Sequence, residues 1–389
     1  MRIKEINKLF KAAALGAALV AVALCPLVAK AAEPVKIGAV QPLTGWASLD
    51  GISVVDGIKI ATEEINKAGG VLKGRPIEMI IEDGKADPVE SVNAVQKLIN
   101  RDKVAAIIGC WASSATLAAM PIVQRSKIPM LVETSTAPLI TKKGNKWVFR
   151  FTSDNDIDGE LMAKYLVPKL GYKKAAYLAV NNDWGRSMSK AVSEIMDKTG
   201  GKVITVEYCA GNEANFTPLL TRIKNSGADS LFITTSYTGI SLIMKQYHEL
   251  GMKMPVFITS GLSAERLMQI AGAKAMEGVY FFERYVPGSP PAARKKENEA
   301  LIAAYKKLKP KEAADMYLVF GYDAVYIMAD AINRAGKTDS TAIRDALAKT
   351  DYQGISGRVK FDENGHSQPR CAITRIENGV NKVVYQLKE

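Results

Sequence analysis

The sequence predicts an α/β protein made of two doubly wound parallel sheets, each with helices on both faces. Short β-branched runs alternate with amphipathic helical patterns almost without interruption, which is typical of strand-helix units in a parallel sheet. One large open sheet would need about eight consecutive parallel strands. An apolar run over residues 147–154 leads into a new series of strand-helix units, and this break favours two sheets over one.

The elements follow from periodicity and from the residues that end each pattern. The expected strands are the apolar, β-branched runs at 35–41, 77–82, 104–109, 130–133, 175–180, 203–208, 230–234 and 256–259. The expected helices have apolar residues at helical spacing: 54–67, 89–100, 115–126, 158–170, 187–199, 216–225, 240–250 and 264–271. Asp87 followed by Pro88 predicts a helix start, and Gly200 a helix end.

The tail of the chain has a different order. Three helical patterns come first and β-rich segments follow: 291–308, 314–334, 341–349, then 355–361 and 372–387. We expect these elements to complete both halves of the protein, with the chain crossing between them more than once.

Residues 1–31 have the pattern of a signal peptide. Four basic residues precede an apolar stretch at 12–28, and Ala29 and Ala31 are small residues at the −3 and −1 positions of a cleavage site after Ala31. The stretch of about 17 apolar residues is short for a membrane span. Leu24 fits a lipoprotein site at Cys25 badly. We therefore expect an exported, periplasmic protein that is released after cleavage.

Charge and cysteine content limit the partners and the covalent structure. The formal net charge is +12 at pH 7, but Lys and Arg are scattered, which is typical of a solvated surface and argues against a nucleic-acid partner. Cys110, Cys209 and Cys371 follow the leader, so at most one disulfide can form among them. We expect the core to hold the fold, and a monomer is the default expectation.

Residue patterns of catalysis are absent from the sequence. His248 falls on the polar side of a predicted helix and His366 in a turn, so both are expected at the surface. No zinc-protease, phosphate-loop or nucleophile-elbow motif occurs. The glycine-rich segment 69–74 follows a helix and precedes a strand, the reverse of a dinucleotide site. We expect no metal, no cofactor and no enzymatic activity.

The residues that directly follow the predicted strands are the candidates for a binding site, because ligands of open α/β sheets lie beyond the carboxyl ends of the strands. In the first series they are rich in hydroxyl groups and tryptophan. Ser113 and Ser114 would open a helix, whose free N–H groups favour a carboxylate. The candidates from this series are Trp46, Trp111, Ser113, Ser114, Thr134, Ser135 and Thr136. Each could instead be an ordinary cap or turn residue.

The second series of strands presents its own loops at 181–185, 235–238 and 260–262. Trp184 and Tyr237 have apolar bodies with polar tips, which suit closure over a ligand from the opposite side. Either could instead belong to the core.

Several segments resemble the leucine/isoleucine/valine-binding protein family of ABC transporters. They occur in the order of the family over nearly the whole chain after the leader: 35–45, 65–74, 107–116, 134–138 and 182–185. The resemblance is specific for the fold and not for the ligand. It implies a type I periplasmic-binding fold, in which two lobes joined by a three-segment hinge close on a solute.

The resemblance also implies lobe boundaries, a partner and roles for single residues. Lobe 1 would comprise 33–154 and 285–363, and lobe 2 would comprise 155–284 and 364–389. The partner would be an ABC transporter permease. Ser113 and the stretch 134–136 match positions that bind the carboxylate and amino groups of the ligand. Cleft-lining positions of the family match Trp111, Trp184, Tyr237 and Tyr317.

Two departures leave the ligand open. The family's acidic partner of the ammonium group aligns with Gly261, and the nearest carboxylate in sequence is Glu265. Asp50, where relatives place an aromatic cleft residue, is a candidate replacement. Otherwise the solute is a carboxylate, an amide or an aromatic acid, held between Trp46, Trp111 and Trp184. A small amino acid and these alternatives remain open, as does a ligand-sensing module for a signalling receptor.

Overall fold

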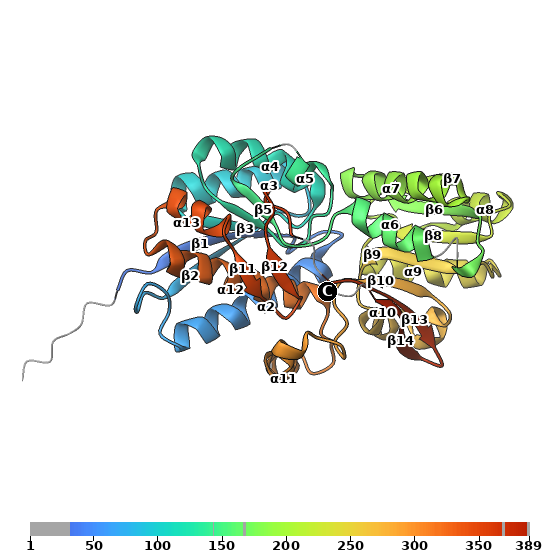
Figure 1. The fold of residues 1–389 in the computed structure, drawn as a ribbon. Coiled ribbons are helices and arrows are strands. Elements are labelled where there is room, and N and C mark those ends of the chain that lie inside the picture. The colour runs from blue at the N-terminus through green and yellow to red at the C-terminus, as the bar shows by residue number, and fades with distance from the viewer. Residues whose placement is uncertain (1–31, 143, 166–168, 368–369, 387–389) are drawn as a thin grey trace, which may run out of the picture. The chain divides into compact units, whose positions relative to one another are not determined.

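The chain forms two separate sheets, as the break in the strand-helix pattern predicts (Figure 1). The computed structural model describes residues 32–142, 144–165, 169–367 and 370–386, and Pro34–Glu389 forms one unit. The predicted leader at 1–31, with its cleavage site, lies outside the described residues. Among the helices that are described, none combines the length and apolarity needed to cross a membrane.

The first sheet has five parallel strands in the order β2-β1-β3-β4-β5. They are β1 (Val35–Gln41), β2 (Ile77–Asp83), β3 (Ala106–Gly109), β4 (Met130–Val132) and β5 (Val148–Arg150). Its central strands are buried on both faces, because helices cover both. One layer contains α2 (Ser48–Lys67), and the other contains α3 (Pro88–Lys97) and α4 (Ser113–Ser126) (Figure 1).

The second sheet has the order β14-β13-β10-β9-β8-β6-β7. Its parallel strands are β6 (Lys174–Val180), β7 (Lys202–Cys209), β8 (Ser230–Thr234), β9 (Val256–Gly261) and β10 (Tyr280–Glu283). An antiparallel hairpin, β13 (Ala372–Glu377) and β14 (Val380–Gln386), extends it at β10. The helices of this half are α6 (Asn155–Tyr165), α7 (Asp183–Thr199), α8 (Thr217–Asn225), α9 (Tyr237–Glu249) and α10 (Ala264–Ala271).

The tail returns to the first sheet before it ends in the second. It contains α11 (Lys295–Leu308), α12 (Met316–Ala335), α13 (Ser340–Leu347) and the hairpin of β11 (Asp351–Gln353) with β12 (Arg358–Lys360). Helix α12 packs on α2 through two glycines. A Cβ added at Gly57 would lie 1.9 Å from the Leu318 carbonyl oxygen, and one at Gly321 would lie 2.1 Å from that of Val54. These glycines let the helix backbones touch.

The structure corrects several sequence-based expectations. Strands β5 and β10 were not expected, and the segment 372–387 is a hairpin that turns at Asn378 and Gly379. Several helices begin earlier than the apolar pattern indicates. Helix α2 begins at Ser48 and α7 at Asp183, where small and polar residues interrupt the regular apolar spacing, whereas α4 begins at Ser113, as the Ser113–Ser114 pair predicts.

One of the two predictions about histidines is confirmed and the other is wrong. His248 is exposed, and its Nε2 lies 2.9 Å from the carbonyl oxygen of Ala275. His366 was expected at the surface, but it is partly buried beside Arg150, where the two backbones form an isolated parallel bridge. Burial and the Arg150 charge lower the pKa of His366.

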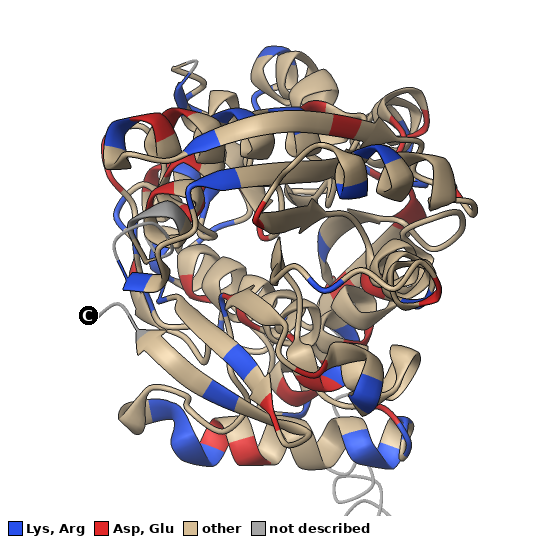
Figure 2. Cartoon of the chain, turned by 90° about the vertical axis from the view of Figure 1, so that its right-hand side faces the viewer, with Lys and Arg blue, Asp and Glu red and all other residues tan. Residues whose placement is uncertain are grey.

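Basic and acidic residues are interspersed along the described elements, in agreement with the scattered charge of the sequence (Figure 2). Cys110, Cys209 and Cys371 are free and buried. Within the described residues the fold is therefore held by packing and hydrogen bonds and not by disulfides.

Candidate functional site

A pocket lies where the carboxyl ends of strands from both sheets meet. The first sheet and α4 contribute Trp111, Ala112, Ser113, Thr134, Ser135 and Thr136, the second sheet and α7 contribute Asn182, Trp184, Ser260 and Arg284, and α12 contributes Met316 and Tyr317. In both sheets the strand order reverses at this edge, between β1 and β3 and between β6 and β8. Such switch points are where open α/β sheets bind ligands.

Helix α4 presents its N-terminus to the pocket. Its cap residue, Ala112, has no side chain that could accept a hydrogen bond from the first turn, so the N–H groups there are not capped by a side chain. The Ser113 hydroxyl accepts hydrogen bonds from the backbone N–H groups of Thr136, at 3.2 Å, and Ala137, at 3.0 Å. These two bonds occupy the lone pairs of Ser113 Oγ. Its hydroxyl hydrogen remains free to be donated.

The hydroxyls of Thr134 and Ser135 hold the backbone of Trp111 in place. Thr134 Oγ1 and Ser135 Oγ donate to the Trp111 carbonyl oxygen at 2.9 Å and 2.8 Å. Trp111 has a φ of +43°, in the left-handed region that side chains other than glycine rarely adopt. Functional sites are where such backbone strain is concentrated. We infer that these two hydroxyls position the indole ring of Trp111.

Two further donors at the pocket have no partner among the described residues. They are the Thr136 hydroxyl and the Trp111 indole N–H, both buried. A buried donor without a partner costs about 1–3 kcal/mol. Together with Ser113 and the start of α4, they form a group of donors that a carboxylate could satisfy, because a carboxylate accepts hydrogen bonds and donates none.

Aromatic rings form a row beside these donors. The Trp46 and Trp111 ring centroids are 5.6 Å apart, and those of Trp111 and Tyr317 are 5.9 Å apart. Tyr237 continues the row, with its centroid 6.0 Å from that of Tyr317. Trp184 lines the pocket from the second sheet. An apolar part of a solute can therefore pack between rings from both halves.

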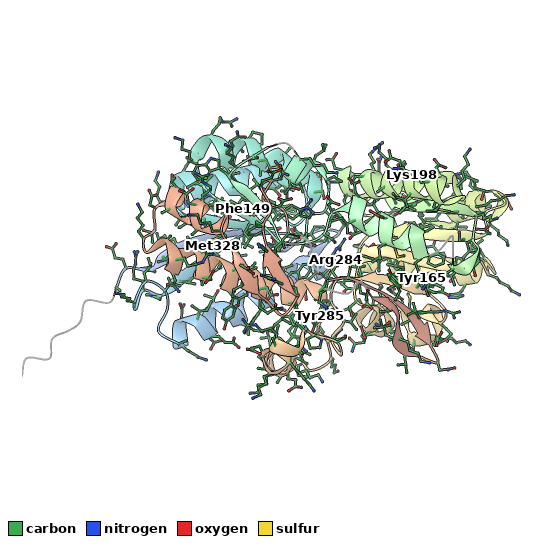
Figure 3. The ribbon with its side chains drawn as sticks, in the orientation of Figure 1. Phe149, Tyr165, Lys198, Arg284, Tyr285 and Met328 are labelled. Atoms are coloured by element: carbon green, nitrogen blue, oxygen red, sulfur yellow. The ribbon has the colours of Figure 1, made fainter. Side chains whose placement is uncertain are left out.

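Arg284 directly follows β10 and lies where the two halves meet (Figure 3). Its guanidinium is buried and lines the pocket. Its Nε donates to Ser153 Oγ at 2.7 Å, and its Nη2 forms an ion pair with Asp158. Nη1 has only long contacts, 3.5 Å to the Ser260 carbonyl oxygen and 3.9 Å to Met316 Sδ. Burial raises the pKa of Asp158.

A second buried cluster joins the two halves next to the pocket. Asp315, the N-cap of α12, accepts a hydrogen bond from Ser53 of α2 at 2.6 Å and one from Tyr237 of α9 at 3.3 Å. Asp50 is buried nearby, and no side chain among the described residues forms a hydrogen bond with its carboxyl group. Burial raises the pKa of Asp50 well above its ordinary value, and the Asp315 carboxyl raises it further.

The structure brings most, but not all, of the expected site residues to the pocket. Those that line it are Trp111, Ser113, Thr134, Ser135, Thr136, Trp184 and Tyr317. Those outside its lining are Trp46, Asp50, Ser114, Tyr237 and Gly261. Trp46 and Tyr237 contact lining rings, and Gly261 lies beneath Arg284. Glu265, the other candidate acid, accepts hydrogen bonds from Ser263 and Asn381.

Sequence reasoning missed Arg284 and Met316 as lining residues. Arg284 follows a strand in the same way as the residues that were found. The signal was present in the apolar run of β10, Tyr280–Glu283, but that run was not recognised as a strand. Met316 comes from the first turn of a helix, a position that the strand-end rule does not cover.

The fold and the pocket define a two-sheet protein that binds a small molecule between its halves, and comparisons with known proteins agree. The periplasmic binding protein family model matches residues 34–380. A leucine-, isoleucine-, valine-, threonine- and alanine-binding protein of Pseudomonas aeruginosa is 28% identical over 335 residues, which cover 86% of this chain and 87% of the relative.

Solved structures share the architecture. A leucine-binding protein of Thermotoga maritima has a TM-score of 0.81 at 30% identity, covering 91% of this chain and 99% of that chain. A solute-binding protein of an ABC transporter from R. palustris, in complex with benzoate, has a TM-score of 0.82 at 20% identity, covering 91% and 96%, and shows the shared fold. The chain belongs to the periplasmic binding protein family and has the type I periplasmic-binding fold, which confirms the resemblance found in the sequence.

Proposed function

We propose that the protein is the exported solute-binding component of an ABC transporter and that it binds a small organic molecule through a carboxylate in the pocket between the sheets. One observation carries this proposal. Donors without partners converge on the pocket at Ser113, Thr136, Trp111 and the uncapped start of α4. A carboxylate at a helix N-terminus gains hydrogen bonds and a favourable interaction with the helix dipole.

The pocket residues come from both halves, so binding and closure are coupled in this proposal. Lobe 1 comprises 33–154 and 285–363, lobe 2 comprises 155–284 and 364–389, and the three connecting segments act as a hinge. The membership of the strands in the two sheets supports this division. A solute that contacts both lobes stabilises the closed form relative to the open form and shifts the population toward it.

Delivery to a permease and location in the periplasm follow from the same proposal. The leader is cleaved after Ala31, the mature protein acts as a monomer, and it binds solute without chemical conversion. Support comes from the relatives, whose names describe binding proteins, and from the benzoate complex, whose protein is named as part of an ABC transporter.

A thermal-shift panel of amino acids, aliphatic and aromatic carboxylates, and amides tests the proposal. A solute that binds only the folded protein stabilises it by about 2.7 kcal/mol at a concentration 100-fold above its Kd. We expect at least one carboxylate to raise Tm with saturable dependence on concentration, and the corresponding amide, which lacks the charge, to bind more weakly. Stabilisation by amides alone, or by no compound of the panel, contradicts the proposal.

A further inference from the structure

The charge on the side chains that line the pocket is of one sign only. Among the described residues that line it, Arg284 is the ionic side chain, and no carboxylate lines it. The other polar side-chain groups are hydroxyls, the indole N–H groups of Trp111 and Trp184, and the Asn182 amide, whose oxygen already accepts a hydrogen bond from the Gly185 N–H at 3.0 Å. The pocket lining therefore presents a guanidinium and hydrogen-bond donors, whereas Asp158, the carboxylate that pairs with this guanidinium, does not line the pocket.

The Arg284 guanidinium is fixed in one orientation. Ser153 and Asp158 hold its Nε and Nη2, and the whole residue is 2% exposed. Each terminal guanidinium nitrogen carries two N–H groups. Since the nearest acceptors of Nη1 lie at 3.5 Å and 3.9 Å, this nitrogen retains donor capacity at the pocket.

Gly261 makes this position of Arg284 possible. A Cβ built on Gly261 would lie 2.0 Å from Arg284 Nη1 and 2.9 Å from its Cζ, so any side chain at 261 would displace the guanidinium. Gly261 also has a φ of +73°, which side chains other than glycine rarely adopt. The Arg284 guanidinium can therefore occupy its position only because Gly261 has no side chain.

Asp158 forms the ion pair with Arg284 but does not line the pocket, and neither do the two other candidate acids, Glu265 and Asp50. Both oxygens of Glu265 accept hydrogen bonds elsewhere, from Ser263 at 2.9 Å and from Asn381 at 3.1 Å. Asp50 does not line the pocket, and burial together with the Asp315 carboxyl favours its neutral form by raising its pKa. An ammonium group in the pocket would face a guanidinium and no carboxylate, and an unpaired buried charge is costly.

We propose that the solute is a carboxylate without an ammonium group, and that Arg284, seated on Gly261, is the residue that selects against amino acids. The inference rests on the proposed function and specifies its substrate class. Arg284 Nη1 donates to the carboxylate, or to another acceptor oxygen of the solute, from the side opposite Ser113 and Thr136. The ammonium group of the amino acid with the same carbon skeleton would be repelled by the Arg284 guanidinium. This repulsion adds specificity to the attraction between Arg284 and the carboxylate.

Matched pairs of compounds test the selection directly. Each pair shares one carbon skeleton and differs by an ammonium group: leucine and 4-methylpentanoate, phenylalanine and 3-phenylpropanoate, 4-(aminomethyl)benzoate and 4-methylbenzoate. We expect calorimetric titration to show that, in any pair that binds, the plain carboxylate binds at least about 100-fold more tightly. Equal or tighter binding of the ammonium member overturns this inference and leaves the proposed function intact. Binding of no member of any pair contradicts both.

Variants test the residue. The double variant Arg284→Gln with Asp158→Asn replaces both members of the ion pair by neutral residues, so neither charge is left buried without its partner. It should weaken carboxylate binding by about 10- to 100-fold. The ratio of the affinities for the plain carboxylate and its ammonium counterpart should fall as well. Arg284→Lys keeps the charge and should keep the preference. Full discrimination in the neutral double variant overturns the assignment to Arg284.

A second buried pair provides the matched control. Arg150 and Asp154 lie 3.3 Å apart and do not line the pocket. Arg150→Gln with Asp154→Asn should leave the affinity ratio within each pair unchanged. If the Arg284 double variant does not fold, Gly261→Ala takes its place, because the added Cβ displaces Nη1 and should reduce the ratio. An unchanged ratio in Gly261→Ala would also overturn the inference.

Discussion

Trp46 and Gly211 are in direct contact: a Cβ added at Gly211 would lie 3.0 Å from Cγ and Cδ2 of the Trp46 indole. Trp46 follows a strand of the first sheet and Gly211 follows a strand of the second, so the two halves meet where one of them has no side chain. The same indole packs edge-on against Trp111, which lines the pocket. Contact between the two halves at Trp46 is therefore transmitted to Trp111, a residue that lines the pocket.

Gly211→Val should weaken solute binding. The added side chain overlaps Trp46 only when the halves are together, and overpacking of this kind costs about 1–3 kcal/mol. We expect affinity measured by calorimetry to fall about 10-fold, with Tm of the solute-free protein nearly unchanged. Gly288→Val is the control, because nothing lies within 4 Å of a Cβ at Gly288. Equal affinities of the two variants would show that the contact is not required for binding.

Tyr237→Phe should weaken both the contact between the halves and solute binding. The change removes the hydrogen bond to Asp315 and the acceptor of the Ser263 N–H, at 3.0 Å. A net loss of about 1–2 kcal/mol is expected, which is about a 10-fold loss of affinity. The control is Tyr247→Phe, whose hydroxyl donates to Met254 within the second half. It should lower stability to urea without changing affinity. The reverse pattern contradicts the prediction.

Ser113→Ala and Thr136→Ala should each weaken binding of the carboxylate. Ser113→Ala removes a donor and leaves the N–H groups of Thr136 and Ala137 without their acceptor. A hydrogen bond to a charged group contributes about 1.5–3 kcal/mol, so a loss of about 10- to 100-fold is expected by calorimetry. Thr136→Ser keeps the hydroxyl and should retain most of the affinity. Unchanged affinity in both alanine variants would remove these residues from the site.

Glu133→Gln should stabilise the protein at neutral and alkaline pH. Glu133 is buried at the end of β4, where Gln41 donates to its Oε1 at 2.7 Å and Oε2 has no partner among the described residues. Burial raises the pKa of Glu133 from 4.5 to about 7. Between these values the folded state holds a proton that the unfolded state releases, so the free energy of unfolding falls as the pH rises through this window.

The predicted difference between Glu133→Gln and the native protein is therefore small at pH 5 and reaches about 3 kcal/mol above pH 7. Urea unfolding between pH 5 and pH 8 measures it. Glu78→Gln, on the exposed side of β2, controls for the loss of a carboxyl group as such. A difference that does not grow with pH would show that burial does not penalise the charged form of Glu133.

Local pattern predicted the strands of the parallel sheets well where apolar runs are bounded by turn residues. Strands β1 and β8 have the expected bounds, because buried parallel strands are continuous apolar runs. The starts of helices were less predictable, since the first turn of α7 combines Asp183 and Arg186 with one large apolar residue, Trp184, and so lacks the regular apolar spacing of the rest of the helix.

Site residues were predictable where they follow a recognised strand, as Ser113 and Thr136 do. Arg284 was not, for two reasons. Its strand, β10, is only four residues long. Its orientation depends on Asp158, which is 126 positions away in the sequence, and on the missing side chain of Gly261. No local periodicity records such contacts.

The three buried thiols have a practical consequence. Cys110, Cys209 and Cys371 are at most 3% exposed, and burial raises the pKa of each, which disfavours the reactive thiolate. Within the described part of the chain, no disulfide has to be formed or rearranged, so folding there needs no thiol oxidase or disulfide isomerase. These three thiols are expected to stay reduced whether the chain folds in reducing or in oxidising surroundings.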